Sequence, residues 1–226
     1  MKKIYFSPSS QPANTYAAGN TNEQEQCRRI AGFAEIAAKR CGFDAKSGVD
    51  GTMYTRTYDS NNWGADLHVP IHTNAFNGTM KGTRMFCSST TGNGGKACKA
   101  IFDALAPLVP GESDGISAAS YYEISATKAP CAYVEAAFHD NAEQAKWIID
   151  HAEQIGEAIV EGICNYYGVK YVKPNAEPTK DENPAENNAG SVKIYRVQVG
   201  AFYNRDYAEN LLNELKQKGY NGFIVE

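Results

Sequence analysis

The sequence predicts an α/β protein: a mostly parallel, twisted sheet flanked by helices on both faces, followed by a small incomplete β-α-β appendage. Over residues 1–170, short apolar strand patterns alternate with amphipathic helical patterns, and this alternation favours a mostly parallel sheet. Residues 171–191 are a predicted linker, because three prolines stand there among Glu, Asp, Asn and Lys. Strand and helix patterns return over residues 192–226.

The elements of the first domain follow from hydrophobic periodicity. Short apolar runs predict strands at residues 3–6, 43–46, 65–72 and 82–88, and a strand pair at 121–125 and 131–134. Apolar residues spaced by three and four predict helices over residues 23–40, 56–63, 96–108 and 141–167. Gly42 is the expected C-cap of the first helix, and the last helix is expected to break near His151.

The appendage contains one β-α-β pattern. Residues 194–200 alternate like a strand, residues 207–218 have an apolar helical face, and residues 223–225 begin another strand. A unit of about 35 residues is too small to bury a stable core by itself. We therefore expect only part of a domain here.

Composition and charge exclude several classes of protein. The net charge is −4 and the pI is near 5.6, which argues against nucleic acid as a partner because phosphate binding needs clustered Lys and Arg. No apolar run approaches the ~20 residues of a transmembrane helix. The two N-terminal lysines are followed by Ser7-Pro8-Ser9-Ser10 rather than by an apolar segment, so no classical signal peptide is expected.

Six cysteines are present without a Cys-x-x-Cys pair, so a structural zinc knuckle is not expected. Several occupy the apolar faces of predicted helices. We expect free, buried thiols that pack as small hydrophobic side chains.

Three residues are candidates for chemistry. His72 ends an apolar strand, where an imidazole suits either a zinc ion or a simple hydrogen bond. Glu135 closes the apolar segment 131–135, where partial desolvation would raise its pKa toward that of a general base; the alternative is a helix-terminal charge or an ion pair. Glu23 begins the first long helix, a position that also favours acidic residues through the helix dipole.

Together, these segments resemble the zinc-dependent N-acetylmuramoyl-L-alanine amidases of the type 3 family. The resemblance spans residues 3–168 and is carried by residues 67–75 (Leu-His-Val-Pro-Ile-His-Thr-Asn-Ala), 82–86 and 128–141. It implies that Glu23 and His72 bind zinc and that Glu135 is the catalytic base. It also implies peptidoglycan as the substrate, cleaved at the amide between N-acetylmuramic acid and L-alanine.

One departure from the family pattern concerns the first zinc ligand. The family carries a histidine after its first strand, whereas Ser10 stands at that position here, and a hydroxyl is a poor zinc ligand beside imidazole. His139, Gln11 and His68 are possible third ligands. His68 lies four residues before His72, ~13 Å away along a strand, so a packing role is preferred for it. His151 is expected at the surface or at the helix break. Weaker metal binding and loss of catalysis are the other interpretations.

The tail resembles the first half of a SPOR domain, through residues 195–202, 208–209 and 215–220. That family binds peptidoglycan glycan strands stripped of peptides. The resemblance implies a role in the cell wall or outside the cell, as an endolysin or autolysin, reached through lysis or another export route.

Two rival functions are weighed against the amidase. One is a non-catalytic wall-binding module that has lost its first zinc histidine. The other is an unrelated hydrolase with a Ser or Cys nucleophile, but the chain has no Gly-x-Ser-x-Gly elbow and no cysteine in an obvious reactive turn.

Overall fold

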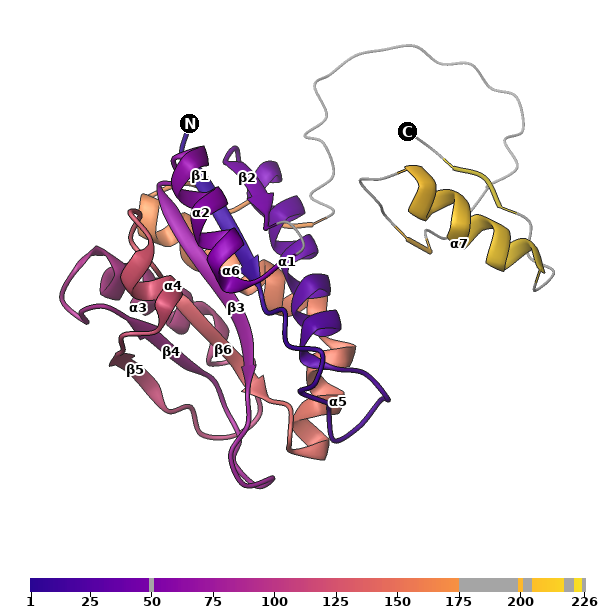
Figure 1. Cartoon of the computed structure of the whole chain (residues 1–226), viewed down its shortest axis with the longest axis horizontal. Coiled ribbons are helices and arrows are strands. Elements are labelled where there is room, and N and C mark those ends of the chain that lie inside the picture. Colours follow the sequence, from indigo (N-terminus) through magenta and orange to yellow (C-terminus); the bar gives the residue numbers. More distant parts are fainter. Residues whose placement is uncertain (49–50, 175–198, 201–204, 218–221, 225–226) are drawn as a thin grey trace, which may run out of the picture. The chain divides into compact units, whose positions relative to one another are not determined.

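The computed structural model describes residues 1–48, 51–174, 199–200, 205–217 and 222–224. The chain divides into two units, Met1–Thr179 and Lys180–Glu226, which are considered separately (Figure 1). Most of the predicted linker and residues 194–198 of the predicted appendage strand lie outside the described residues.

The first unit is built on a six-stranded sheet with the order β2-β1-β3-β6-β4-β5. Neighbouring strands are parallel except for β4 and β6, which are antiparallel. The mostly parallel α/β fold predicted from the sequence is thereby confirmed. The strands are β1 (Lys3–Pro8), β2 (Asp44–Ser47), β3 (Leu67–Asn74), β4 (Arg84–Cys87), β5 (Gly115–Ala118) and β6 (Tyr133–Phe138).

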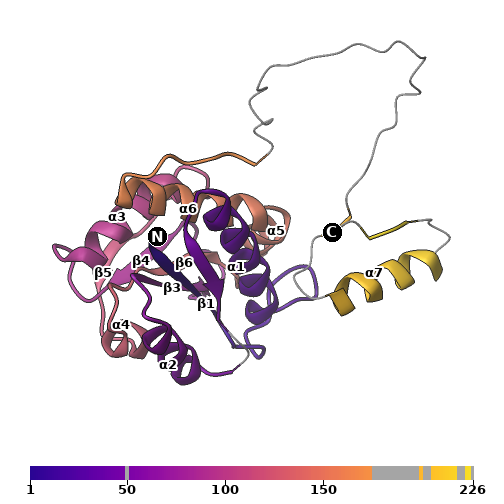
Figure 2. The same ribbon diagram turned by 90° about the horizontal axis from the view of Figure 1, so that it is seen from above.

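Helices cover both faces of this sheet, as Figure 2 shows from above. One face carries α1 (Glu23–Arg40), α3 (Asn93–Leu105), α5 (Ala142–Asp150) and α6 (Ala152–Tyr167). The other face carries only the shorter helices α2 (Met53–Trp63) and α4 (Tyr122–Ala126). This second face therefore has less helical cover.

The N-terminus of α1 is set by its cap. The Asn22 side chain accepts a hydrogen bond from the Glu25 backbone N–H, which satisfies one of the free donors of the first turn. Small buried residues follow on one face of α1, including Cys27, Ala31 and Ala34. They let α6 approach closely: a Cβ at Gly156 would lie 2.9 Å from the Ala34 backbone nitrogen.

One predicted element is wrong in kind. Residues 121–125 were expected to form a strand, but Tyr122–Ala126 form the short helix α4. A short apolar run does not by itself distinguish a strand from a buried helical turn, and here Glu123 and Ile124 are the buried positions. The strand β5 lacks a strong apolar run and was not predicted.

The remaining helices agree with the sequence to within a few residues. Helices α2 and α3 each begin three residues before their expected starts, and the break near His151 separates α5 from α6 as expected. In the second unit, α7 (Arg205–Gln217) confirms the predicted helix. All six cysteines are free and buried, as predicted. Among the described residues, no helix is both long and apolar enough to span a bilayer.

The contact between α3 and α6 depends on Gly162. A Cβ at this position would meet the Ile101 Cα at 2.3 Å, whereas a Cβ at Gly32 in α1 would meet nothing within 4 Å. We expect Gly162→Ala to lower the free energy of unfolding by about 1–3 kcal/mol through overpacking. Gly32→Ala, the matched control, should raise it by about 0.5–1 kcal/mol. Urea unfolding of both variants tests this, and equal effects would contradict the close approach of the two helices.

Candidate active site

The candidate residues meet on one face of the sheet. Gln11 follows β1 and His72 lies near the carboxyl end of β3, whereas Glu135 is the third residue of β6. His72 and Glu135 are register partners in the parallel pair of β3 and β6, so their side chains leave the same face of the sheet. This is the face covered only by α2 and α4. The Tyr133 ring stacks on the His72 imidazole, with ring centroids 4.7 Å apart.

Glu23 and His72 form a buried pair. Glu23 Oε1 lies 2.9 Å from His72 Nδ1, and Asn14 donates a hydrogen bond to Glu23 Oε2 at 2.6 Å. Burial opposes the charged form of Glu23, but its hydrogen bond to His72 and the imidazolium charge hold its pKa below the usual range. Burial likewise opposes the charge on His72, but the carboxylates of Glu123 and Glu23 raise its pKa to about 9.

Gln11 is the third side chain at this point, beside Glu23 and His72. Its side-chain amide nitrogen lies 3.4 Å from that atom, and its amide oxygen accepts from Asn14 at 3.3 Å. Rotating the amide by half a turn would direct the oxygen at the same point, since the two ends of an amide are nearly isosteric. A carboxylate, an imidazole and an amide oxygen make a possible metal donor set. No cluster of three His, Cys, Asp or Glu side chains suited to a metal occurs among the described residues.

Glu135 stands beside this group as a partly buried carboxyl. Its Oε2 atom is buried and has no hydrogen-bond partner. Burial raises the pKa of Glu135, as does the charge of Glu23, while His72 and Arg84 lower it; the result is a pKa of about 7. A carboxyl with this pKa exchanges a proton readily near neutral pH.

A fourth residue, Glu123 at the start of α4, was not predicted from the sequence. It is 3 % exposed, and its carboxylate is surrounded by Ser7, Arg56 and His68. Glu123 Oε2 also lies 3.9 Å from His72 Nε2. Burial would raise the Glu123 pKa, but the neighbouring His68 and His72 and the Arg56 charge hold it well below its usual range.

A cleft of about 500 Å³ opens onto His72 and Gln11. Its walls include Tyr54 from α2 and Tyr122 from α4, whose rings meet edge to face at 4.5 Å. Tyrosines offer rigid faces that are apolar over the ring and polar at the hydroxyl. The cleft therefore gives an extended ligand a route to the Glu23–His72 pair.

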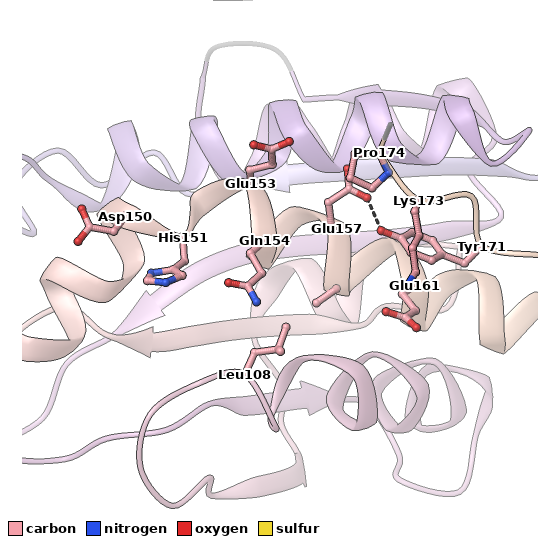
Figure 3. Close-up of a pocket in the computed structure, with 11 residues that line it drawn as sticks. Leu108, Asp150, His151, Glu153, Gln154, Glu157, Glu161, Tyr171, Lys173 and Pro174 are labelled. Carbon is pink, nitrogen blue, oxygen red and sulfur yellow. Dashed lines mark hydrogen bonds between the residues drawn. The ribbon is translucent and has the colours of Figure 1, made fainter. Parts of the chain in front are cut away.

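A second hollow, of about 470 Å³, lies along α6 and contains none of the candidate catalytic or metal-binding residues. Figure 3 shows Glu153, Glu157 and Glu161 along this helix, with the Tyr171 hydroxyl donating to Glu157. Arg40 also pairs with Glu157. The central carboxylate of this hollow is therefore paired with partners from its own chain.

The other histidines lie apart from this group. His139 is buried against Tyr16, and its Nδ1 contacts the Thr73 carbonyl at 2.9 Å, so the structure does not bring it to His72. His68 is fully buried and stacks on Tyr5, which agrees with a packing role. His151 is the half-buried residue at the break between α5 and α6.

The serines after β1 are placed differently from one another. Ser10 lines the cleft, whereas Ser9 Oγ lies beside Gln11 and lowers the Glu23 pKa through a hydrogen bond. The residues on either side of Ser10 are therefore the ones in contact with the Glu23–His72 group.

This face of the sheet thus brings together a buried carboxylate–imidazole pair and a carboxyl whose pKa burial raises. The sequence pattern of the N-acetylmuramoyl-L-alanine amidase family matches residues 32–165, more than half of the chain. The chain belongs to this family and is an N-acetylmuramoyl-L-alanine amidase that acts on peptidoglycan. Residues 179–226 match the SPOR domain.

Similar proteins agree with this assignment. The N-acetylmuramoyl-L-alanine amidase CwlM of Bacillus licheniformis is 22% identical over 235 aligned residues, which cover 100% of this chain and 85% of the relative. The catalytic domain of CwlV from Bacillus (Paenibacillus) polymyxa has the same fold, with a TM-score of 0.68 and 17% identity over 75% of this chain and 100% of that domain. The catalytic domain of the CD27L endolysin, which targets Clostridia difficile, gives a TM-score of 0.64 and 23% identity over 73% of this chain and 98% of that domain.

The raised pKa of Glu135 leads to a stability prediction. In the folded protein this pKa is about 7 instead of the ordinary 4.5, so folding favours the protonated acid. The contribution of Glu135 to stability is complete below pH 4.5 and is lost as the pH rises through 7. In metal-free protein, Glu135→Gln should therefore raise the free energy of unfolding at pH 8 by up to about 3 kcal/mol and change it little at pH 4. Denaturant unfolding at the two pH values measures this. An equal effect at both would contradict a raised pKa of Glu135 in the folded protein.

Proposed function

We propose that this chain hydrolyses the amide between N-acetylmuramic acid and L-alanine with zinc held by Glu23 and His72 and with Glu135 as the general base. The observation that carries the proposal is the register pairing of His72 with Glu135, on the sheet face that Glu23 also reaches. A pair of side chains that can bind a cation thus lies next to a carboxyl that can accept a proton.

The donor chemistry fits a zinc ion of modest affinity. Glu23 and His72 are strong ligands whose contacting atoms are already 2.9 Å apart. With its amide rotated, Gln11 would supply its oxygen as the third ligand at the position where its nitrogen now lies, 3.4 Å from His72 Nδ1. An amide oxygen is a weaker zinc ligand than imidazole. When bound, zinc supplies Lewis-acid polarisation of the scissile carbonyl and acidifies water.

Glu135 moves the proton. Its Oε2 atom is buried and has no hydrogen-bond partner, and burial raises the pKa of the carboxyl to about 7. It accepts a proton from the attacking water and returns it to the leaving nitrogen of L-alanine. The carboxyl is ready for this transfer because desolvation destabilises its charged form.

The tyrosine-lined cleft receives the substrate. Tyr54 and Tyr122 line the same cleft as His72, and the saccharide and peptide of a muropeptide can lie along this wall. We also assign residues 179–226 a role in holding the enzyme on glycan strands, because they match the SPOR domain.

Glu135→Gln tests the general base. We expect turnover of purified peptidoglycan to fall by about 10²–10⁴-fold, because the proton acceptor is lost while the ligands remain. Zinc content should stay at the wild-type level. Mass spectrometry of released peptides with a free N-terminal L-alanine measures activity, and elemental analysis measures zinc. Wild-type turnover in the variant would refute the assignment of Glu135.

A Gln11 series tests the third ligand. Gln11→Ala should weaken zinc binding, and Gln11→His should strengthen it by supplying an imidazole beside Glu23 and His72. Ser10→Ala is the matched control and should leave the affinity unchanged, because Ser10 lines the cleft and its two neighbours make the contacts. Chelator competition measures the dissociation constants. Weaker zinc binding in Ser10→Ala, with no effect of Gln11→Ala, would assign the third ligand to Ser10.

A further inference from the structure

Glu123 is the centre of a network of buried charged and polar side chains on the α2 and α4 face of the sheet. Glu123, Arg56, His68 and Ser7 are each no more than 3 % exposed. Removing such groups from water costs free energy that apolar residues of the same volume would not cost. A network of this kind in a cleft wall is therefore a candidate for a functional role.

The contacts within the network fix the carboxylate in one orientation. Glu123 Oε1 accepts from Ser7 Oγ and lies 3.2 Å from His68 Nε2. Glu123 Oε2 accepts from Arg56 Nη2 at 3.4 Å, while Arg56 Nε donates to Ser7 Oγ at 2.7 Å. His68 is held in turn by Ser60 through Nδ1 at 2.9 Å. Each partner is secured by another, so the carboxylate has little freedom to turn.

This fixed carboxylate faces the side of His72 that the zinc proposal leaves unused. His72 Nδ1 is directed at Glu23 and Gln11, whereas His72 Nε2 is buried and has no hydrogen-bond partner. Its nearest acidic oxygen is Glu123 Oε2, at 3.9 Å. A hydrogen bond between these two atoms would require them to approach by about 1 Å.

We propose that Glu123 is a positioning residue that accepts the Nε2–H of His72 and so fixes the ring with Nδ1 directed at the metal position. A histidine ligand commonly donates its second ring N–H to a carboxylate, which fixes its tautomer and strengthens it as a ligand. The Arg56–His68–Ser7 cage then holds Glu123 for this task. The inference rests on the proposed role of His72 as a ligand.

The network also ties the cleft wall to the site. Glu123 lies beside Tyr121 and Tyr122 on the chain, and both tyrosines line the cleft. Tyr122 and Glu123 are the first two residues of the five-residue helix α4, and Tyr121 is its N-cap. Glu123 and His72 line this same cleft.

The test compares full-length wild type, Glu123→Gln and Glu35→Gln. Glu35 is the matched control, since it is also a buried carboxylate with hydrogen bonds, to Lys39 and the Ser47 backbone, but lies away from His72. We expect Glu123→Gln to weaken zinc binding by about tenfold or more. We also expect the His72 Nε2 proton, followed by ¹H–¹⁵N NMR, to exchange faster with solvent. Glu35→Gln should match wild type in both measurements.

The outcomes separate the two proposals. Unchanged zinc affinity and unchanged proton exchange in Glu123→Gln would overturn the positioning role, even if the unfolding midpoint fell. If wild type took up no zinc, the metal part of the proposed function would fail, and the proton exchange alone would decide for or against Glu123. If Glu123→Gln does not fold, Glu123→Asp replaces it: the charge remains for Arg56 and His68, but the carboxylate is withdrawn from His72. Wild-type zinc affinity in that variant would equally overturn the inference.

Discussion

The parallel pairing of β3 with β6 is the constraint on which the rest of the site depends. It places His72 and Glu135 side by side on one face of the sheet, and a slip of one residue would send one of them to the opposite face. The neighbouring strand β1 then delivers the loop that carries Gln11, and α1 begins where Glu23 reaches His72. The position of His72 relative to Glu135 therefore follows from the register of these two strands.

The two faces of the sheet have unequal helical cover, and His72 and Glu135 lie on the less covered face. The face with α1, α3 and α6 holds the large apolar core, which includes Ile30, Ile101 and Ile159. The opposite face receives only α2 and α4, which leaves room for a cleft and for polar side chains beneath it. The large apolar core thus lies on one side of the sheet. On the other side, burial disfavours the charged form of Glu135.

Sequence patterns predicted much of the fold, because alternating strands and helices leave few arrangements for a mostly parallel sheet. They also identified Glu23, His72, Gln11 and Glu135, which the structure brings together. They did not identify Glu123, because its neighbours come from β1, α2 and β3, and nothing in residues 121–125 alone distinguishes a helical turn from a strand. His139 was a reasonable candidate from its distance along the chain. The structure instead buries it against Thr73, the residue after His72, whose side chain leaves the opposite face of β3.

The six cysteines have a consequence for the surroundings in which this enzyme can work. All are free and buried, and burial raises the pKa of the Cys27, Cys87, Cys98, Cys131 and Cys164 thiols. Since the thiolate is the form that oxidants attack, these side chains resist both oxidation and disulfide exchange while the domain is folded. While it is folded, the first unit therefore keeps all six thiols buried. Because no disulfide holds these six side chains, unfolding of the domain would expose all six thiols to solvent at once.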